Sequence, residues 1–264
     1  DYSNGNISVT FTSAPSAGQA IKVTYSSNLE ESGNYARLAP QMATIPINAE
    51  VIVVGQEIGL FQAYEMQQMF GRMMEDDAKT DLSDAVMREV AQKIIAKMYA
   101  RVLADSSGNK TEWDSTAPTN TSDYLHRMTL PFKMATAEKK ISQRLGRGRI
   151  DVWVGGQGFC EYVSTLEGFV PSNISTSGPH VFGTYNNRVI IKAPQLPEMI
   201  AIGVYTGTSL FDKPAVYAPY MPLFTTASLP VPNNVLKSQS IAAVYAGVDL
   251  VLAKAITLFE ITAS

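Results

Sequence analysis

The sequence predicts an α+β fold, with helices in the middle of the chain and strands at both ends. Three patterns lead to this class. Apolar and polar residues alternate near the N-terminus, apolar residues recur every three to four positions across the middle, and strand-like runs separated by turn residues fill the last third. Because strands and helices are segregated, an alternating βαβ architecture is not expected.

Composition narrows the class of protein. The chain has 264 residues, of which 45% are hydrophobic, so it can bury a sizeable core. Its 21 basic and 24 acidic residues give a formal charge of −3, which argues against a dedicated duplex-binding protein. One cysteine and two histidines are too few for an internal disulfide or for most zinc centres.

Two further predictions concern membrane-spanning segments and the start of the sequence. No uninterrupted apolar run of about 18 residues is present, so we expect a soluble chain. The sequence starts at Asp1 without an initiator methionine or a signal segment, and we expect a preceding segment to be missing from it.

The first quarter is expected to form an extended arm. Apolar and polar residues alternate at 7–11 and again at 21–25, on either side of a turn at 13–18, which is typical of a β-hairpin. A strand is predicted at 45–54, with Pro46 at its start or at a sheet edge.

Two helices are predicted next. The first runs from Ile58 to Phe70 and stops where Gly71 and the acidic stretch 75–77 interrupt it. Asp81 is expected to cap the second helix, with Asp84 beside the positive end of its dipole. The second helix extends to about residue 104 on a stripe made of Val86, Val90, Ile94, Ile95, Met98, Tyr99, Val102 and Leu103.

The rest of the chain mixes short elements. A polar loop at 105–120 leads to a helix that ends near Leu145 and has Pro131 in its first turn or at a kink. A strand at 150–154 and a helix at 157–165 follow. The remaining strands are expected at 189–191 after an Asn186-Asn187 turn, at 200–205, at 215–218, and in at least two pieces at 240–260.

A cysteine nucleophile is the first chemistry to weigh. Cys160 could attack a substrate if His126 or His180 lay within hydrogen-bond reach as its base. No local signature surrounds Cys160, and a free cysteine near Phe159 is typical of a small buried hydrophobe. The residues therefore favour a structural role.

Two glycine clusters and a basic patch are the next candidates. The stretches 146–149 and 155–158 could cradle phosphate, but neither has a dinucleotide or P-loop spacing, which favours plain turns. Arg144, Arg147 and Arg149 form the densest basic patch. We expect them to face neighbouring subunits or carboxylates rather than to recognise a nucleic acid.

Three other segments complete the candidates. Asp76, Asp77, Asp81 and Asp84 lack the calcium-loop pattern and are explained by helix-start electrostatics. The methionines at 66, 69, 73 and 74 are expected to fill irregular packing. The run 217–223 combines two prolines with Tyr217 and Tyr220, which suits an extended segment at an edge or interface.

The order of these features resembles the major capsid proteins of large contractile-tailed bacteriophages. The resemblance covers the chain from about Ile58 onward. Its most specific pieces are the Gly183–Lys192 stretch with its Asn-Asn-Arg turn, the Gly203–Gly207 turn followed by Phe211-Asp212, and the Tyr217–Leu223 run. The sequence departs from the family in lacking the N-terminal arm, consistent with proteolytic maturation, and in lacking an arginine before Tyr245.

The resemblance implies the HK97-like major capsid protein fold, which comprises an E-loop, a peripheral domain with a long spine helix, and an axial domain. By position, residues 1–57 would form the E-loop region and 58–149 the peripheral domain. Residues 150–227 would form the axial domain, and 228–264 would return as strands to the peripheral domain.

The resemblance also implies a function. The chain would be a non-enzymatic subunit that assembles with itself, as hexamers and pentamers, into an icosahedral shell around packaged double-stranded DNA, without sequence-specific DNA binding, cofactor, metal or membrane. It would be assembled in the host cytoplasm and found in the virion, with decoration, portal and scaffold proteins as further partners. The candidate subunit-interface residues are Arg144, Arg147, Arg149, Tyr217 and Tyr220. Two alternatives remain, an encapsulin-like compartment around a protein cargo and a cysteine hydrolase that uses Cys160.

Overall fold

The computed structural model describes residues 8–18, 20, 22, 24, 44–105, 108–173, 178–209 and 212–263. The chain divides into two compact units, Asp1–Thr44 and Ile45–Ser264. In the first unit, the predicted turn is present at 17–18, where Gly18 has a φ of 90°. The predicted hairpin is wrong at 8–11, which form no strand: Val9 and Phe11 are exposed, and an isolated two-stranded hairpin is only marginally stable. The hairpin residues Ile7, Ile21, Val23 and Tyr25 lie outside the described residues.

The second unit contains an antiparallel four-stranded sheet. Its strands are β1 (Ala49–Gly59), β10 (Asn234–Leu250), β8 (Ala215–Thr225) and β9 (Leu229–Val231). The order is β1-β10-β8, and β9 also pairs with β10. β1 lies at an edge and begins three residues after Pro46, as the missing donor of proline requires.

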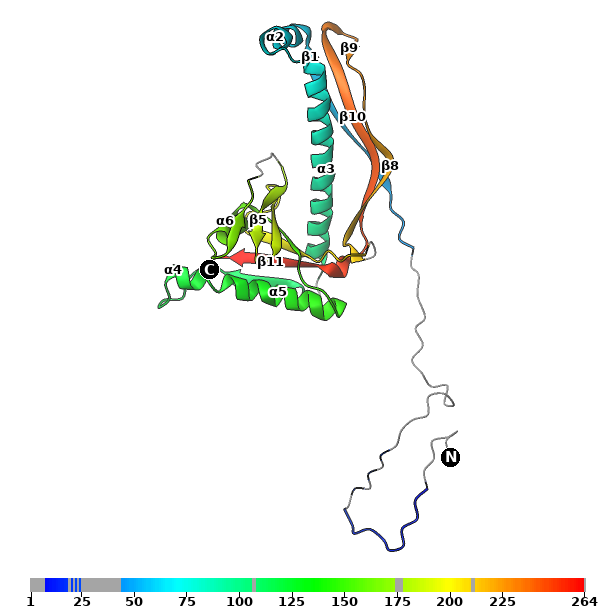
Figure 1. The fold of residues 1–264 in the computed structure, drawn as a ribbon, viewed down its shortest axis with the longest axis vertical. Coiled ribbons are helices and arrows are strands. Elements are labelled where there is room, and N and C mark those ends of the chain that lie inside the picture. Colours follow the sequence, from blue (N-terminus) through cyan, green and yellow to red (C-terminus); the bar gives the residue numbers. More distant parts are fainter. Residues whose placement is uncertain are drawn as a thin grey trace. The chain divides into compact units, whose positions relative to one another are not determined.

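The helix α3 (Met74–Ala104) packs along one face of this sheet (Figure 1). Leu82, Val86 and Val90 are buried against inward-facing residues of β10. These β10 residues alternate along the strand and are Ala242, Val244, Ala246 and Val248. The predicted stripe and the helix end at Ala104 are confirmed, except that Leu103 is exposed.

The start of this region differs from the prediction. β1 continues to Gly59, so that α2 (Leu60–Phe70) begins two residues late, and Ile58 is a buried strand residue. α2 does end at Gly71, which has the left-handed φ of 67°. The acidic stretch 75–77 is the first turn of α3, where carboxylates are favoured by the helix dipole. Asp81 and Asp84 therefore lie inside α3, and the predictions that they cap it and complement its dipole are wrong.

The second sheet has seven strands in the order β2-β11-β7-β3-β6-β5-β4. Along the chain these are β2 (Lys110–Asp114), β3 (Val152–Gly155), β4 (Phe169–Pro171), β5 (His180–Tyr185), β6 (Arg188–Lys192), β7 (Ile200–Val204) and β11 (Ile256–Thr262). β2–β11 and β3–β6 are parallel pairs, and the other pairs are antiparallel. The Asn186-Asn187 turn between β5 and β6 is confirmed, with φ values of 48° and 62°.

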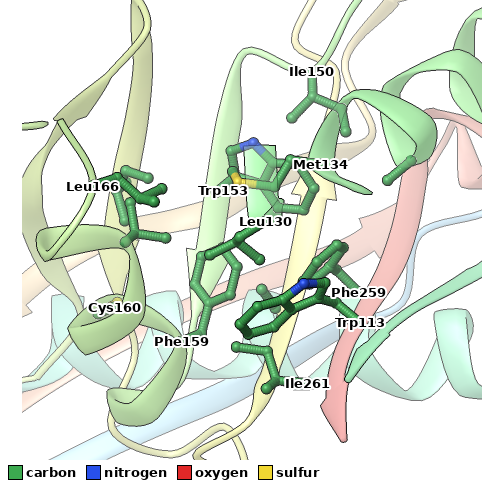
Figure 2. Close-up of a cluster of buried hydrophobic side chains, with 14 of the residues drawn as sticks. Trp113, Leu130, Met134, Ile150, Trp153, Phe159, Cys160, Leu166, Phe259 and Ile261 are labelled. Atoms are coloured by element: carbon green, nitrogen blue, oxygen red, sulfur yellow. The ribbon is translucent and has the colours of Figure 1, made fainter. Parts of the chain in front are cut away.

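Each face of the seven-stranded sheet is covered. Three helices, α4 (Asp123–Arg127), α5 (Leu130–Leu145) and α6 (Gln157–Ser164), accompany it. On one face α5 and α6 enclose a core in which Trp153, Phe159 and Phe259 contact one another and Trp113 lies nearby (Figure 2). The opposite face packs on the C-terminal part of α3, through the cluster that contains Ile95, Met98, Val102, Val154, Ile202 and Val204.

Several sequence predictions are refined here. Pro131 lies in the first turn of α5, as expected. β2 lies inside the predicted polar loop 105–120, because its pairing is with β11 from the far end of the chain. β8 is longer than predicted, and register shifts in its pairing with β10 accommodate Pro219 and Pro222. Among the described residues no helix is both long enough and apolar enough to cross a bilayer.

The two sheets draw on segments from several of the expected domain ranges. α5 and β2, from 58–149, join the seven-stranded sheet, and β8, from 150–227, joins the four-stranded sheet beside α3. From 228–264, β10 belongs to the four-stranded sheet and β11 to the seven-stranded one.

Candidate assembly surface

The structure leaves Cys160 without the partner that a nucleophile needs. Its side chain is fully buried in the core of the seven-stranded sheet, and this burial raises the pKa of the thiol to about 12. The ring of His126 lies 2.6 Å from the carbonyl oxygen of Asp114, and that of His180 lies 2.9 Å from the carbonyl oxygen of Gly178. Each imidazole is thus held by backbone elsewhere, and the thiol is protonated at neutral pH.

The glycine cluster at 155–158 is filled by protein. A Cβ atom added at Gly156 would lie 2.1 Å from the carbonyl oxygen of Pro197. The amides of Gly156 and Phe159 donate to the carbonyl oxygens of Ile200 and Glu198, at 2.9 and 3.0 Å. These glycines allow close packing at the start of α6, and the interpretation as a turn and helix start is confirmed.

The acidic and methionine-rich segments surround the start of α3. Asp76 forms an ion pair with Lys79 at 3.4 Å. Within the described ranges, no group of three or more histidine, cysteine or carboxylate side chains could hold a metal ion. The prediction that the methionines fill packing is wrong for Met69 and Met73, which are exposed because α2 has no buried residue and the described residues do not cover these side chains.

The three arginines of the basic patch all face carboxylates of the same chain. Arg144 pairs at 2.7 Å with Asp105, the residue that caps the end of α3. Arg147 pairs with Asp212, and Arg149 lies 3.8 Å from Asp151. The last two pairs involve exposed arginines and are screened by water, so the Arg144 pair contributes most to holding α5 against α3.

The pair of Arg147 with Asp212 connects two segments that are far apart in the sequence, 147–149 and 203–212. A Cβ atom added at Gly148 would lie 2.6 Å from the ring of Tyr205, and one added at Gly207 would lie 2.4 Å from Cβ of Asp212. The Arg147–Arg149 turn therefore rests against the 203–207 turn and Asp212. Gly148 and Gly207 are needed because a larger side chain at either position would overlap Tyr205 or Asp212.

The two tyrosines of β8 have different surroundings. Tyr217 is half-buried and packs against the core between the four-stranded sheet and α3. Tyr220 is 79% exposed, and its ring meets that of Tyr245 edge-on with 5.3 Å between centroids. Tyr220 is thus available to a neighbouring molecule, whereas Tyr217 is mainly a core residue.

The face of the four-stranded sheet that points away from α3 carries exposed apolar residues. Val51 and Val53 on β1 are exposed, while their neighbour Ile52 is buried toward α3. Met221 and Phe224 on β8 are also exposed and pair across the sheet with the β10 residues Tyr245 and Ala243. We call this set of residues the outer sheet face. One face of this sheet is thus packed on α3, and the other exposes apolar side chains, as is typical of a surface that binds another protein surface.

α2 is the functional feature that sequence reasoning missed. None of its eleven residues is buried. Its exposed large side chains are Leu60, Phe61, Tyr64, Met69 and Phe70, with Phe61 at 68% and Met69 at 76%. At 100° per residue these side chains point to several sides of the helix. The signal in the sequence was the presence of large apolar side chains on several sides of this segment, because a helix that packs one face on its own chain is typically apolar on that face.

Comparisons with known proteins establish the fold. No protein-family model and no curated protein matches the sequence. The capsid structure of the cyanophage P-SCSP1u aligns with 89% of this chain and 80% of its own, with a TM-score of 0.53 and 12% identity. A structure from Microbacterium phage Oxtober96 aligns over 83% and 73%, with a TM-score of 0.51 and 9% identity.

A third structure, the procapsid of satellite phage P4 that includes its size determination protein, aligns over 94% of this chain and 83% of its own, with a TM-score of 0.50 and 9% identity. At such identities the likeness is one of fold. The chain has the α+β, HK97-like capsid fold, and the fold class predicted from the sequence is confirmed.

We expect Cys160→Ala to have little effect. Removal of one buried sulfur should lower the free energy of unfolding by about 0.5–1.5 kcal/mol, as for a small core substitution. Urea unfolding of the unassembled subunit measures this, with Ser164→Ala, an exposed site on the same helix, as the control. Because the thiol is fully buried and its pKa is raised, it should react with a thiol reagent only after unfolding. Fast modification of the native protein at pH 7 would contradict this account.

Proposed function

We propose that the chain is a major capsid protein, a structural subunit that assembles with itself into the shell of a tailed bacteriophage. The observation that carries the proposal is α2. A large apolar side chain gains about 1.5–3 kcal/mol on full burial, and α2 leaves five of them in water. Soluble monomers rarely expose so many large apolar side chains on one short helix. Since its side chains point to several sides, one flat partner cannot cover α2, and more than one neighbouring copy is needed.

The outer sheet face supports the same function. It is a second apolar surface, formed by β1 and β8 rather than by α2. Two different apolar surfaces on one chain permit head-to-tail contacts, which close into rings when the rotation between copies allows it. Many modest contacts of this kind add up over a closed array. Tyr220 lies at this face and remains a candidate interface residue.

We propose domain bounds that follow the two sheets and therefore differ from the ranges 1–57, 58–149, 150–227 and 228–264 expected from the sequence. α3 and the four-stranded sheet form the peripheral domain, with α3 as the spine helix. The seven-stranded sheet with α4, α5 and α6 forms the axial domain. Residues 1–44 form the E-loop region. On this assignment Arg144 joins the two domains inside one subunit, and Arg147 and Arg149 contribute to subunit contacts only at an exposed rim.

The proposed shell holds DNA by enclosure. A wall that bound phosphate tightly would add a salt-dependent attraction for each phosphate it neutralised. The net charge of −3 and the pairing of Arg144, Arg147 and Arg149 with carboxylates support a wall with little such attraction. The burial of Cys160 argues against the alternative of a cysteine hydrolase, because a substrate could not reach the thiol.

An encapsulin-like shell would share this fold. The phage origin of the three similar structures favours a phage head. We expect particles purified from infected or phage-producing cells to contain double-stranded DNA, measured as nuclease-resistant DNA after external digestion. Particles that instead carry a folded protein cargo and no protected DNA would assign the chain to the encapsulin-like class.

We predict that Phe61→Asp prevents assembly without unfolding the subunit. The side chain is exposed in the chain alone, so its loss costs the monomer little, whereas a buried charge at a contact is costly. The concentration needed for shell formation should rise at least about tenfold, which corresponds to about 1.4 kcal/mol per subunit. Electron microscopy and sedimentation measure shells, and circular dichroism measures folding.

The matched control is Gln68→Asp, which places the same charge at an exposed polar position of the same helix. It should assemble like the parent chain. Normal shell yield from Phe61→Asp would rule out α2 as an assembly contact.

We also predict weak binding of duplex DNA by the unassembled subunit. The dissociation constant at physiological salt should be no tighter than about 10⁻⁶ M, the strong end of non-specific affinity. Titration with labelled duplex across salt concentrations measures it. Tighter binding that disappears when Arg147 and Arg149 are replaced by glutamine would refute enclosure without affinity.

A further inference from the structure

A small cavity lies between the first turns of α5 and the β5–β6 hairpin. Its volume is about 60 Å³, and Trp153, Met134, Ala135, Tyr185 and Arg188 are among the residues that line it. It is separate from α2 and from the outer sheet face. Its lining combines apolar atoms with several groups that can form hydrogen bonds.

The indole N–H of Trp153 is the group that requires explanation. The side chain is 1% exposed, and Nε1 has no hydrogen-bond partner among the described residues. By contrast, Nε1 of the other tryptophan, Trp113, donates to Oγ1 of Thr129 at 2.9 Å. Buried donors in native proteins are almost always paired with protein or with ordered water.

The orientation of the ring directs this N–H toward the cavity. β3, which carries Trp153, lies between β7 and β6. The six-membered ring lies over β7, since a Cβ atom added at Gly203 would be 3.1 Å from Cζ3. Nε1 is on the opposite edge of the indole and therefore points toward β6 and the hairpin. Trp153 and Met134, which both line the cavity, are labelled in Figure 2.

Polar groups on the other side of the cavity complete the site. Arg188 forms an ion pair with Glu138 of α5, and both side chains are largely buried. Tyr185 and Asn186, on the hairpin, also line the cavity, and both have oxygen atoms that can accept hydrogen bonds. A water molecule needs about 10–15 Å³ and two to four polar partners, so the cavity is large enough for one and its lining residues offer such partners.

We propose that this cavity binds one ordered water molecule, which accepts a hydrogen bond from Nε1 of Trp153 and donates to oxygen atoms at the hairpin side. The water joins β3 to the hairpin beneath the first turns of α5. It accepts from the indole N–H of Trp153, which has no partner in the part of the chain that the structure describes. The inference does not depend on the assembly of the chain.

The test is a crystal structure of the unassembled subunit at about 2 Å resolution or better, with the Trp153→Phe and Trp113→Phe variants as a matched pair. We expect solvent density within hydrogen-bond distance of Nε1 of Trp153 in the parent chain and in Trp113→Phe. In Trp153→Phe the density should be lost while the ring stays in place. If Trp153→Phe does not fold, the parent chain and Trp113→Phe decide the question.

Three results would overturn the proposal. One is an empty cavity in the parent chain. Another is density that persists unchanged in Trp153→Phe, because the indole would then not be its anchor. The third is an anomalous signal in the cavity when chloride is replaced by bromide, which would identify a bound anion instead of water.

Discussion

The buried stripe of α3 is the contact on which both sheets depend. Its N-terminal part packs Val86 and Val90 against β10, and its C-terminal part packs Met98 and Val102 against the seven-stranded sheet. A four-stranded sheet with both faces in water would be unstable, and α3 supplies the buried contacts that cover one of its faces. The ion pair of Arg144 with Asp105 connects α5 to the C-terminal end of α3.

Several charged side chains of the described residues form ion pairs within the chain, while large apolar side chains are exposed. The three arginines of the 144–149 region face carboxylates, and Lys93 and Lys237 pair with Glu50 and Glu57. Meanwhile α2 and the outer sheet face expose large apolar side chains. Soluble monomers rarely expose large apolar surfaces of this kind. The difference is expected of a subunit whose final surroundings include other copies of itself.

Local signals account for what could be predicted from the sequence. The stripe of α3, Pro131 at the start of α5 and the Asn186-Asn187 turn each depend on residues close together in the chain. β2 could not be predicted, because Trp113 is buried by contacts with distant segments, and neither could the exposure of α2, which depends on what the remaining chain fails to cover. The acidic residues before Asp81 were read as a break, although the dipole of a helix makes them favourable in its first turn. The arginine pairs form across turns that the sequence could only place individually.

The length of α3 has a mechanical consequence. Its 31 residues span about 46 Å as one rigid rod with both sheets attached to it. A tilt of about 5° at one end moves the other end by about 4 Å, which is close to the diameter of a methyl group and enough to change which side chains meet at α2. Small differences in the tilt of α3 between otherwise identical subunits can therefore produce different packing at the α2 end of the helix. Local curvature in an array of such rods is set by angle, while the internal structure of each subunit stays the same.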